Sequence, residues 1–103
     1  MSYDLIDSDI LAWVNRNSLK LFTHYEGNAI SEFRAVYVSS EDGECCQIWI
    51  DPPTIDTISV HARSVETRRN EEMQNDWHVQ KKDLGSTLED ALKFVRAWFG
   101  RPS

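Results

Sequence analysis

Two adjacent cysteines, Cys45 and Cys46, precede the segment QIWID and a pair of prolines, and thiols in such a setting could hold a metal or carry redox chemistry. Neighbouring residues of a strand point to opposite faces, so a regular strand cannot bring both thiols to one metal ion. Structural zinc sites use two separated pairs such as CxxC, and the sequence has no second pair. A disulfide between neighbours is strained. We therefore expect no metal site and no cofactor, with Cys46 a small core residue and Cys45 a partly exposed thiol.

The histidines offer a second chemical possibility. They fall on three different expected strands: His24, His61 and His78. His61 and His78 are expected on one face of the sheet, where Asp51 or Asp56 would complete a set typical of a metal or nuclease centre. Spacing adds no support, because 17 acidic residues offer many such combinations. Cys45 with His61 as a nucleophile pair meets the same objection. Without GxSxG, HExxH or a phosphate-cradling glycine loop, the sequence makes no specific case for an enzyme.

Length and composition predict a single domain over residues 1–103. The chain is 41% hydrophobic and 11% aromatic, which is enough for one packed core. No apolar run approaches the roughly 20 residues needed to cross a bilayer. The opening segment, MSYDLIDSDIL, has acidic residues and no basic one, unlike a secretory signal peptide. We therefore expect a cytoplasmic protein.

The net charge of −6 bears on the class of partner. A phosphate backbone attracts clustered Lys and Arg, but this chain offers only two short pairs, Arg68 with Arg69 and Lys81 with Lys82. Direct binding to nucleic acid is therefore disfavoured, and nothing indicates a membrane. An acidic protein can instead steer a basic partner toward itself, although the same charge would also simply favour solubility.

Periodicity predicts an α+β fold, in which an antiparallel sheet of about five strands has an N-terminal and a C-terminal helix packed on one face. Apolar residues recur at helical spacing over residues 4–16 and again over residues 86–99. Ser86 precedes Glu89 by three positions, which is the spacing of a capping box.

Segments rich in β-branched and aromatic residues are the expected strands: 19–25, 32–40, 44–51, 54–63 and 76–82. The Asp42–Gly43 pair predicts a hairpin over residues 32–51. The charged segment 64–75 is expected to be an extended loop or a long hairpin connection.

Alternation along the strands assigns side chains to two faces. The inward face is apolar: Cys46, Ile48, Ile50, Ile58, Val60, Ala62, Trp77 and Val79. The opposite face carries polar residues and one tryptophan: Gln47, Trp49, Asp51, His61 and Arg63. An exposed tryptophan among polar groups is an anchor that protein interfaces favour, unless segment 64–75 folds over Trp49 and makes it core. A slip of one residue in register would exchange the two faces.

The order of elements over residues 31–99 resembles a known family. A strand ending in QIWID is followed by ISVHAR, a polar connection, DWHVQKK and the amphipathic segment STLEDALKFVRAWF. This order, the placement of the tryptophans and the small size resemble bacterial contact-dependent growth inhibition immunity proteins, in particular short members built as a sheet with a C-terminal helix. The resemblance implies a non-enzymatic protein that neutralises the C-terminal domain of a cognate toxin. Such toxins are commonly nucleases, and some attack tRNA with the help of elongation factor Tu.

The residues expected to block the active site or substrate groove of the toxin follow from the face assignment and from the acidic residues at the hairpin turn: Trp49 as the anchor, with Glu41, Asp42, Glu44, Asp51, Gln47, His61 and Arg63 around it. Two other functions stay open. A secretion chaperone or adaptor is also small, acidic and cytoplasmic, and a small enzyme would be centred on His61, His78 and Cys45.

Overall fold

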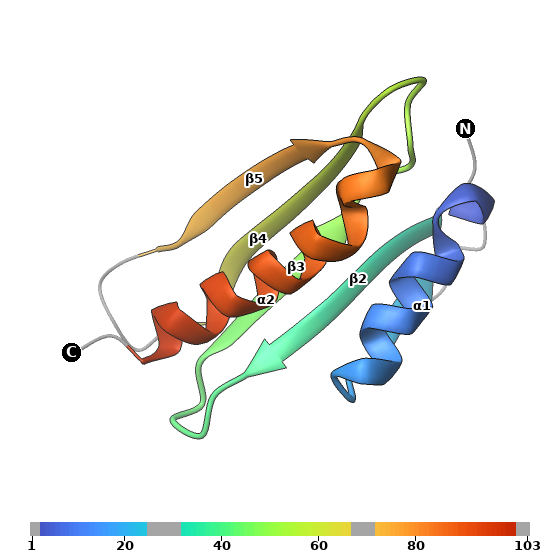
Figure 1. The fold of residues 1–103 in the computed structure, drawn as a ribbon. Helices are drawn as coiled ribbons and strands as arrows, with labels where there is room; N and C mark the ends of the chain where they lie inside the picture. The colour runs from blue at the N-terminus through green and yellow to red at the C-terminus, as the bar shows by residue number, and fades with distance from the viewer. Residues whose placement is uncertain (1–2, 25–31, 67–71, 101–103) are drawn as a thin grey trace.

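The computed structural model describes residues 3–24, 32–66 and 72–100. The bounds of the elements are η1 Tyr3–Leu5, α1 Asp7–Arg16, β1 Leu21–His24, β2 Glu32–Ser39, β3 Cys45–Ile50, β4 Ile58–Glu66, β5 Gln74–Val79, η2 Lys81–Asp83 and α2 Leu84–Phe99. Both α-helices lie on the same face of the sheet (Figure 1). The predicted α+β class is confirmed, with a five-stranded antiparallel sheet and a helix from each end of the chain.

The sheet is a simple meander with the spatial order β1-β2-β3-β4-β5. The predicted hairpin over residues 32–51 is confirmed, because β2 and β3 pair from Arg34 with Ile50 to Ser39 with Cys45. Gly43 closes its turn with φ 87°, a left-handed conformation that glycine adopts without strain. The Asp-Gly pair thus fixes the register of the two central strands.

Strand boundaries differ from the prediction around β4 and β5. The expected strand 54–63 begins only at Ile58, because Thr54 turns the chain: its N–H and its hydroxyl both donate to the Thr57 carbonyl, at 2.9 and 3.0 Å. β4 then continues to Glu66, so much of the expected connection 64–75 is strand. The middle of that connection, 67–71, lies outside the described residues, as does the end of the first expected strand at Tyr25.

The closing helix begins three residues earlier than the capping-box spacing indicated, with Asp83 and not Ser86 at the N-cap position. Ser86 lies inside the first turn of α2, where its hydroxyl donates to the Asp83 carbonyl at 3.0 Å. Glu89 does not reach back to cap the helix; its carboxylate accepts instead from Arg16 of α1 at 2.7 Å. A capping box requires a reciprocal pair at the helix start. The predicted capping box is therefore wrong.

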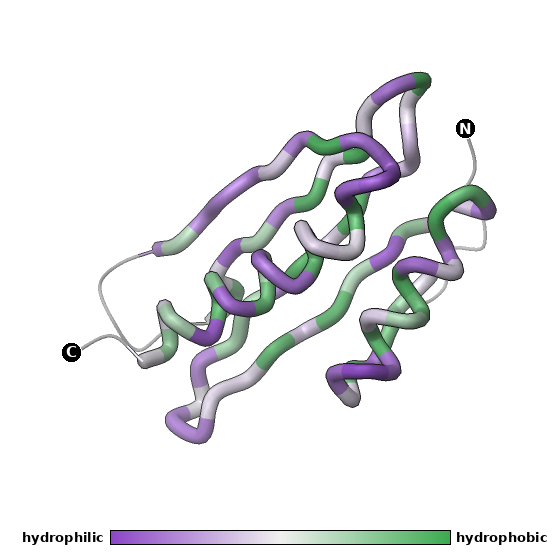
Figure 2. The backbone as a smooth tube through the Cα atoms, in the orientation of Figure 1, coloured by the Kyte–Doolittle hydropathy of each residue, from purple (hydrophilic) through white to green (hydrophobic). Residues whose placement is uncertain are grey.

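The core lies between the inner face of the sheet and the two helices. Residues of β3 alternate between half-buried and buried, and Figure 2 shows the alternation of apolar and polar residues along the strands. The predicted inward residues Cys46, Ile48 and Val60 are fully buried, which confirms the register-dependent assignment. Trp13 of α1 is also fully buried and packs in the same cluster.

Candidate functional site

The face of the sheet turned away from the helices, here called the outer face, carries an ordered set of polar and aromatic side chains. Antiparallel pairing places Trp49 of β3 between Ala35 of β2 and His61 of β4, and Asp76 of β5 opposite His61. Directly opposite residues on one face have their Cβ atoms about 5 Å apart, so these side chains must touch. The sheet register therefore builds a row across four strands.

Trp49 is held by its two neighbours on β4. Its indole stacks on the His61 ring with centroids 4.6 Å apart and planes 19° apart, and the Arg63 guanidinium carbon lies 5.4 Å from the indole centroid. Trp49 is consequently half-buried by residues of its own sheet, whereas sequence analysis offered either a freely exposed tryptophan or a core one. Part of the indole still faces solvent, in a fixed orientation.

His61 lies between two carboxylates. Its Nδ1 is 2.6 Å from Asp76 Oδ1 and its Nε2 is 2.7 Å from Asp51 Oδ2. A carboxylate only accepts hydrogen bonds, so both ring nitrogens donate when both bonds are made, which is the protonated imidazolium. His61 therefore ties β3, β4 and β5 together on the outer face.

The electrostatics of this triplet favour the charged forms. Burial alone lowers the pKa of His61, but hydrogen bonds with Asp76 and Asp51 and the charges of both carboxylates outweigh it, so the pKa of His61 is raised above its ordinary value. The hydrogen bond with His61 lowers the pKa of Asp76. The two carboxylates therefore favour the protonated form of His61 more than its burial disfavours it.

The same geometry limits what the histidines can do chemically. A general base needs a free ring nitrogen within reach of the proton it takes, and both nitrogens of His61 are occupied. His78 Nδ1 contacts Ser59 Oγ at 2.9 Å, but among the described residues no side chain orients its other ring nitrogen, as nucleophilic sites require. Asp56 lies in the turn before β4, away from this group.

Metal binding is not favoured either, in the part of the chain that the structure describes. No group of three or more His, Cys, Asp and Glu residues there could hold a metal ion. Cys46 is fully buried, and burial together with Cys45 and Glu44 raises the pKa of its thiol to about 12. A thiol with such a pKa is neither a nucleophile nor a ready metal ligand at neutral pH.

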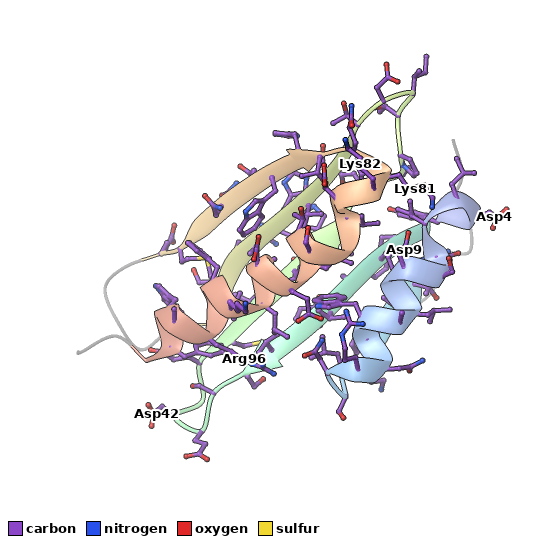
Figure 3. The ribbon with its side chains drawn as sticks, in the orientation of Figure 1. Asp4, Asp9, Asp42, Lys81, Lys82 and Arg96 are labelled. Atoms are coloured by element: carbon purple, nitrogen blue, oxygen red, sulfur yellow. The ribbon has the colours of Figure 1, made fainter. Side chains whose placement is uncertain are left out.

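The acidic hairpin turn divides into exposed and buried residues. Glu41 and Asp42 are exposed, and Asp42 extends from the tip of the turn (Figure 3). Glu44 is only 4% exposed, and its backbone N–H donates to Ser40 Oγ at 3.1 Å. The expectation that Glu44 offers a surface charge to a partner is therefore wrong, because the turn folds this residue inward.

Seven of the eight predicted residues form two groups, and the eighth is the buried Glu44. Gln47, Trp49, Asp51, His61 and Arg63 share the outer face. Glu41 and Asp42 lie at the turn beside Cys45, whereas Asp51 follows the other end of β3, roughly 20 Å away at about 3.3 Å per residue. The acidic turn and the carboxylate of Asp51 therefore cannot act as one continuous patch.

Sequence analysis missed two members of the outer face. Tyr37 accepts a hydrogen bond from Gln47 Nε2 at 3.2 Å and packs edge-on against Phe22, with centroids 5.4 Å apart. Asp76 completes the pairing of His61. The alternation of β5 already placed Asp76 opposite to Trp77, so its face could have been assigned, but its pairing with His61 required the register of β4 and β5.

A shallow cavity of about 250 Å³ lies elsewhere, where η1 meets the turn between β3 and β4. It is lined mainly by apolar groups, among them Leu5, Ile55 and Pro53. Small-molecule sites usually exceed about 300 Å³ and contain a few converging polar groups. The volume of this cavity lies below that range, so the outer face is the better candidate.

Comparison with known proteins found no relative of this chain. The chain matches no protein-family model, and neither a curated protein nor a solved structure is significantly similar to it. Among the helices of the described residues, none is long and apolar enough to span a bilayer.

Proposed function

We propose that this chain is an immunity protein that binds a cognate toxin domain and neutralises it by blocking its active site or substrate groove. The observation that carries the proposal is the interlocked group around Trp49, in which His61, Arg63 and Asp51 hold a half-exposed indole on the solvent side of the sheet. Tryptophan, tyrosine and arginine are the residues that dominate binding energy at protein interfaces.

The outer face is ordered before any partner arrives. Gln47 is bonded to Tyr37, and His61 is bonded on both sides, so these side chains have already lost their rotamer freedom. Ordering a mobile side chain on association costs about 0.5–1.5 kcal/mol each. A face that is ordered in advance avoids much of this cost, which suits a role in binding.

The predicted residues of the outer face and those of the hairpin turn differ in how much unpaired negative charge they present to a partner. Asp51 and Asp76 each bond His61 through one carboxylate oxygen, so their negative charge is partly neutralised. Glu41 and Asp42 are exposed at the hairpin turn. A nuclease must present basic groups to its phosphate substrate. The acidic turn is therefore the part suited to enter such a groove, with Trp49 as a separate anchor roughly 13 Å farther along β3, at about 3.3 Å per residue from Cys45.

The partner in this proposal is the C-terminal domain of a toxin, with nucleases, including those that attack tRNA, as the first class to test. Elongation factor Tu would take part only through the toxin. This assignment rests on the resemblance of the sequence to contact-dependent growth inhibition immunity proteins, supported by the acidic charge of −6 and the ordered outer face.

The test is capture of the partner by the tagged chain from a lysate of its own host, followed by expression of the captured domain. We expect one basic domain bound at equal stoichiometry, which arrests growth when expressed alone and is harmless when this chain is co-expressed. A captured domain that never impairs growth would refute immunity. Capture of a secreted protein through an unfolded segment would indicate a secretion chaperone instead.

A matched pair of variants locates the interface. Trp49→Ala is expected to weaken binding by about 30-fold or more, the size of an interface hot spot. Leu11→Ala removes a similarly apolar side chain, 46% exposed, from α1 on the opposite side of the sheet, and should leave binding unchanged. Equal affinity of both variants would show that the outer face is not the interface.

A further inference from the structure

The two edges of the sheet differ in how well they are protected against pairing with another strand. β1 has only four residues, and its register with β2 is broken between Phe22 and His24. β5 has six residues in unbroken register with β4, and the described residues place no strand on its other side. Short strands, bulges, proline and charged side chains, lysine above all, are the usual protections of an edge. β5 has no bulge, lysine or proline, and Asp76 is its one acidic residue.

The hydrogen bonds fix which backbone groups of β5 point outward. Asp51 N–H donates to the Ser59 carbonyl at 3.0 Å, so the odd-numbered residues of β4 bond toward β3. Ser64 N–H donates to the Met73 carbonyl at 2.9 Å, so the even-numbered residues of β4 bond to the odd-numbered residues of β5. Backbone groups alternate in direction along an antiparallel strand. The N–H and C=O groups of Gln74, Asp76 and His78 therefore face outward.

If β5 pairs with β5 of a second copy, the side chains that come to lie opposite each other decide which register is favoured. Two symmetric antiparallel registers each pair five of the six residues of β5: one sets Asp76 against Asp76, the other sets Asp76 against His78. Like charges directly opposite each other destabilise a strand pair, whereas opposite charges and hydrogen-bonding pairs stabilise it. Only the second register places a carboxylate against an imidazole, and the two-fold axis makes this contact twice.

The helix side of β5 supplies apolar contact in that register. Trp77 is half-buried and packs edge-on against Phe94 of α2, with centroids 5.7 Å apart, and Phe94 is 37% exposed. The two-fold axis would bring Trp77 opposite Trp77 of the second copy at a non-hydrogen-bonded position, where Cα atoms are about 4.5 Å apart. Each copy would thus cover the exposed aromatic edge of the other.

We propose that β5 pairs antiparallel with β5 of a second copy of this chain, with Asp76 opposite His78, so that two sheets join into one. This inference does not rest on the proposed function, since it is argued from the backbone groups at the edge of the sheet, although Asp76 also bonds His61 on the outer face. The core is complete within one chain. The dimer should therefore dissociate without unfolding, and an interface of one short strand pair predicts affinity in about the micromolar to millimolar range.

The experiment is sedimentation equilibrium of the purified chain over a wide range of concentration. We expect the mass to rise from 12.0 kDa toward twice that value. His78→Pro removes an outward N–H that the ladder with β4 does not use, and should weaken association at least tenfold. His78→Ala removes the same side chain but keeps the N–H, so it should weaken association clearly less. Circular dichroism verifies that each variant is folded.

A second variant keeps the test decisive if proline disturbs the strand. His78→Asp retains the backbone donor and sets a carboxylate against Asp76 of the second copy, so it should also weaken association at least tenfold. Monomeric wild-type protein at all concentrations up to about 1 mM would overturn the proposal. A dimer that survives both His78→Pro and His78→Asp would overturn it as well, by locating the interface elsewhere.

Discussion

His61 organises the outer face because each of its ring nitrogens has a carboxylate partner on a neighbouring part of the sheet. Asp51 follows β3 and Asp76 belongs to β5, so the imidazolium joins three strands through two short contacts. Trp49 lies flat on the same ring. His61, which the sequence offered as a partner of a nucleophile, therefore has a structural role in the folded protein. Its ring also fixes the orientation of the Trp49 indole.

His61→Gln should lower the free energy of unfolding in a pH-dependent way. Because the pKa of His61 is raised in the folded state, its contribution is complete below the unfolded value of about 6.5 and is lost as the pH rises through the folded value. The difference between wild type and variant should therefore narrow from about pH 6 to about pH 9. Urea unfolding of wild type and variant at both pH values measures this difference in the free energy of unfolding.

The control for this measurement is Gln47→Ala, which removes a neighbour on the same face without touching the charge triplet. Its difference from wild type should stay constant between the two pH values. A difference for His61→Gln that does not narrow would mean that the two carboxylates do not hold a proton on the imidazole.

The two cysteines should differ sharply in reactivity. Cys45 is a free thiol that is only partly buried, whereas Cys46 is fully buried and has a pKa raised to about 12 by burial and by its neighbours. A thiol-specific dye should modify one cysteine of the native protein and both in denaturant. Cys45→Ser should abolish the native reaction. Equal reaction of both thiols in the native protein would contradict the burial of Cys46.

At the scale of elements, the β2–β3 hairpin is the feature that sequence and structure specify together. The Asp-Gly pair directs the turn, and the register that follows places Trp49 on the outer face and Ile48 in the core. The side-chain period of a strand is two residues, so a slip of one residue would exchange these faces. The turn therefore controls the composition of the candidate site.

Gly43→Ala should destabilise the protein by about 1 kcal/mol, because Gly43 has φ 87° and a side chain there is strained. The matched control is Gly85→Ala in the first turn of α2, where an added Cβ meets nothing within 4 Å. That change should be neutral or stabilise by about 0.5 kcal/mol, because alanine favours a helix. Thermal and urea unfolding distinguish the two, and equal effects would contradict the strain assigned to the turn.

At the scale of the whole molecule, the N-terminal segment is fastened to the sheet by a small polar network within the packed layers. The Arg34 side chain is 10% exposed and bonds both carboxylate oxygens of Asp7, at 2.8 and 3.2 Å. Its guanidinium carbon lies 4.3 Å from the Tyr3 ring centroid, and Tyr3 donates to the Ile50 carbonyl at 2.7 Å. This network joins η1 and α1 to β2 and β3.

Asp7→Asn should destabilise the protein by about 2 kcal/mol, because it removes the negative charge that Asp7 places against the buried guanidinium of Arg34. Asp9→Asn is the matched control in the same helical turn. Among the described residues, Asp9 pairs with the exposed Lys81, with 3.6 Å between Oδ2 and Nζ; Figure 3 labels both residues. Its loss should cost less than about 0.5 kcal/mol. If Asp7→Asn and Asp9→Asn lowered the free energy of unfolding equally, the burial of Arg34 would not strengthen its pairing with Asp7.

Most of the fold could be predicted because its determinants are local or periodic. Apolar spacing located both helices, and alternation assigned Cys46, Ile48 and Val60 to the core correctly. Boundaries were less predictable: the Thr54 turn delayed β4, and Ser86 entered the helix instead of capping it. Both errors arise because a hydroxyl can bond nearby backbone in several ways, and only the path of the folded chain selects one.

The sequence by itself determined the class of the fold and the two faces of the sheet, since both follow from side-chain periodicity. It also assigned five residues to one face: Gln47, Trp49, Asp51, His61 and Arg63. Only the tertiary structure decided that Glu44 is buried and that His61 is occupied by Asp51 and Asp76. Pairings between strands depend on register, and residues that are 10 and 15 positions apart in the chain meet only when the sheet aligns them.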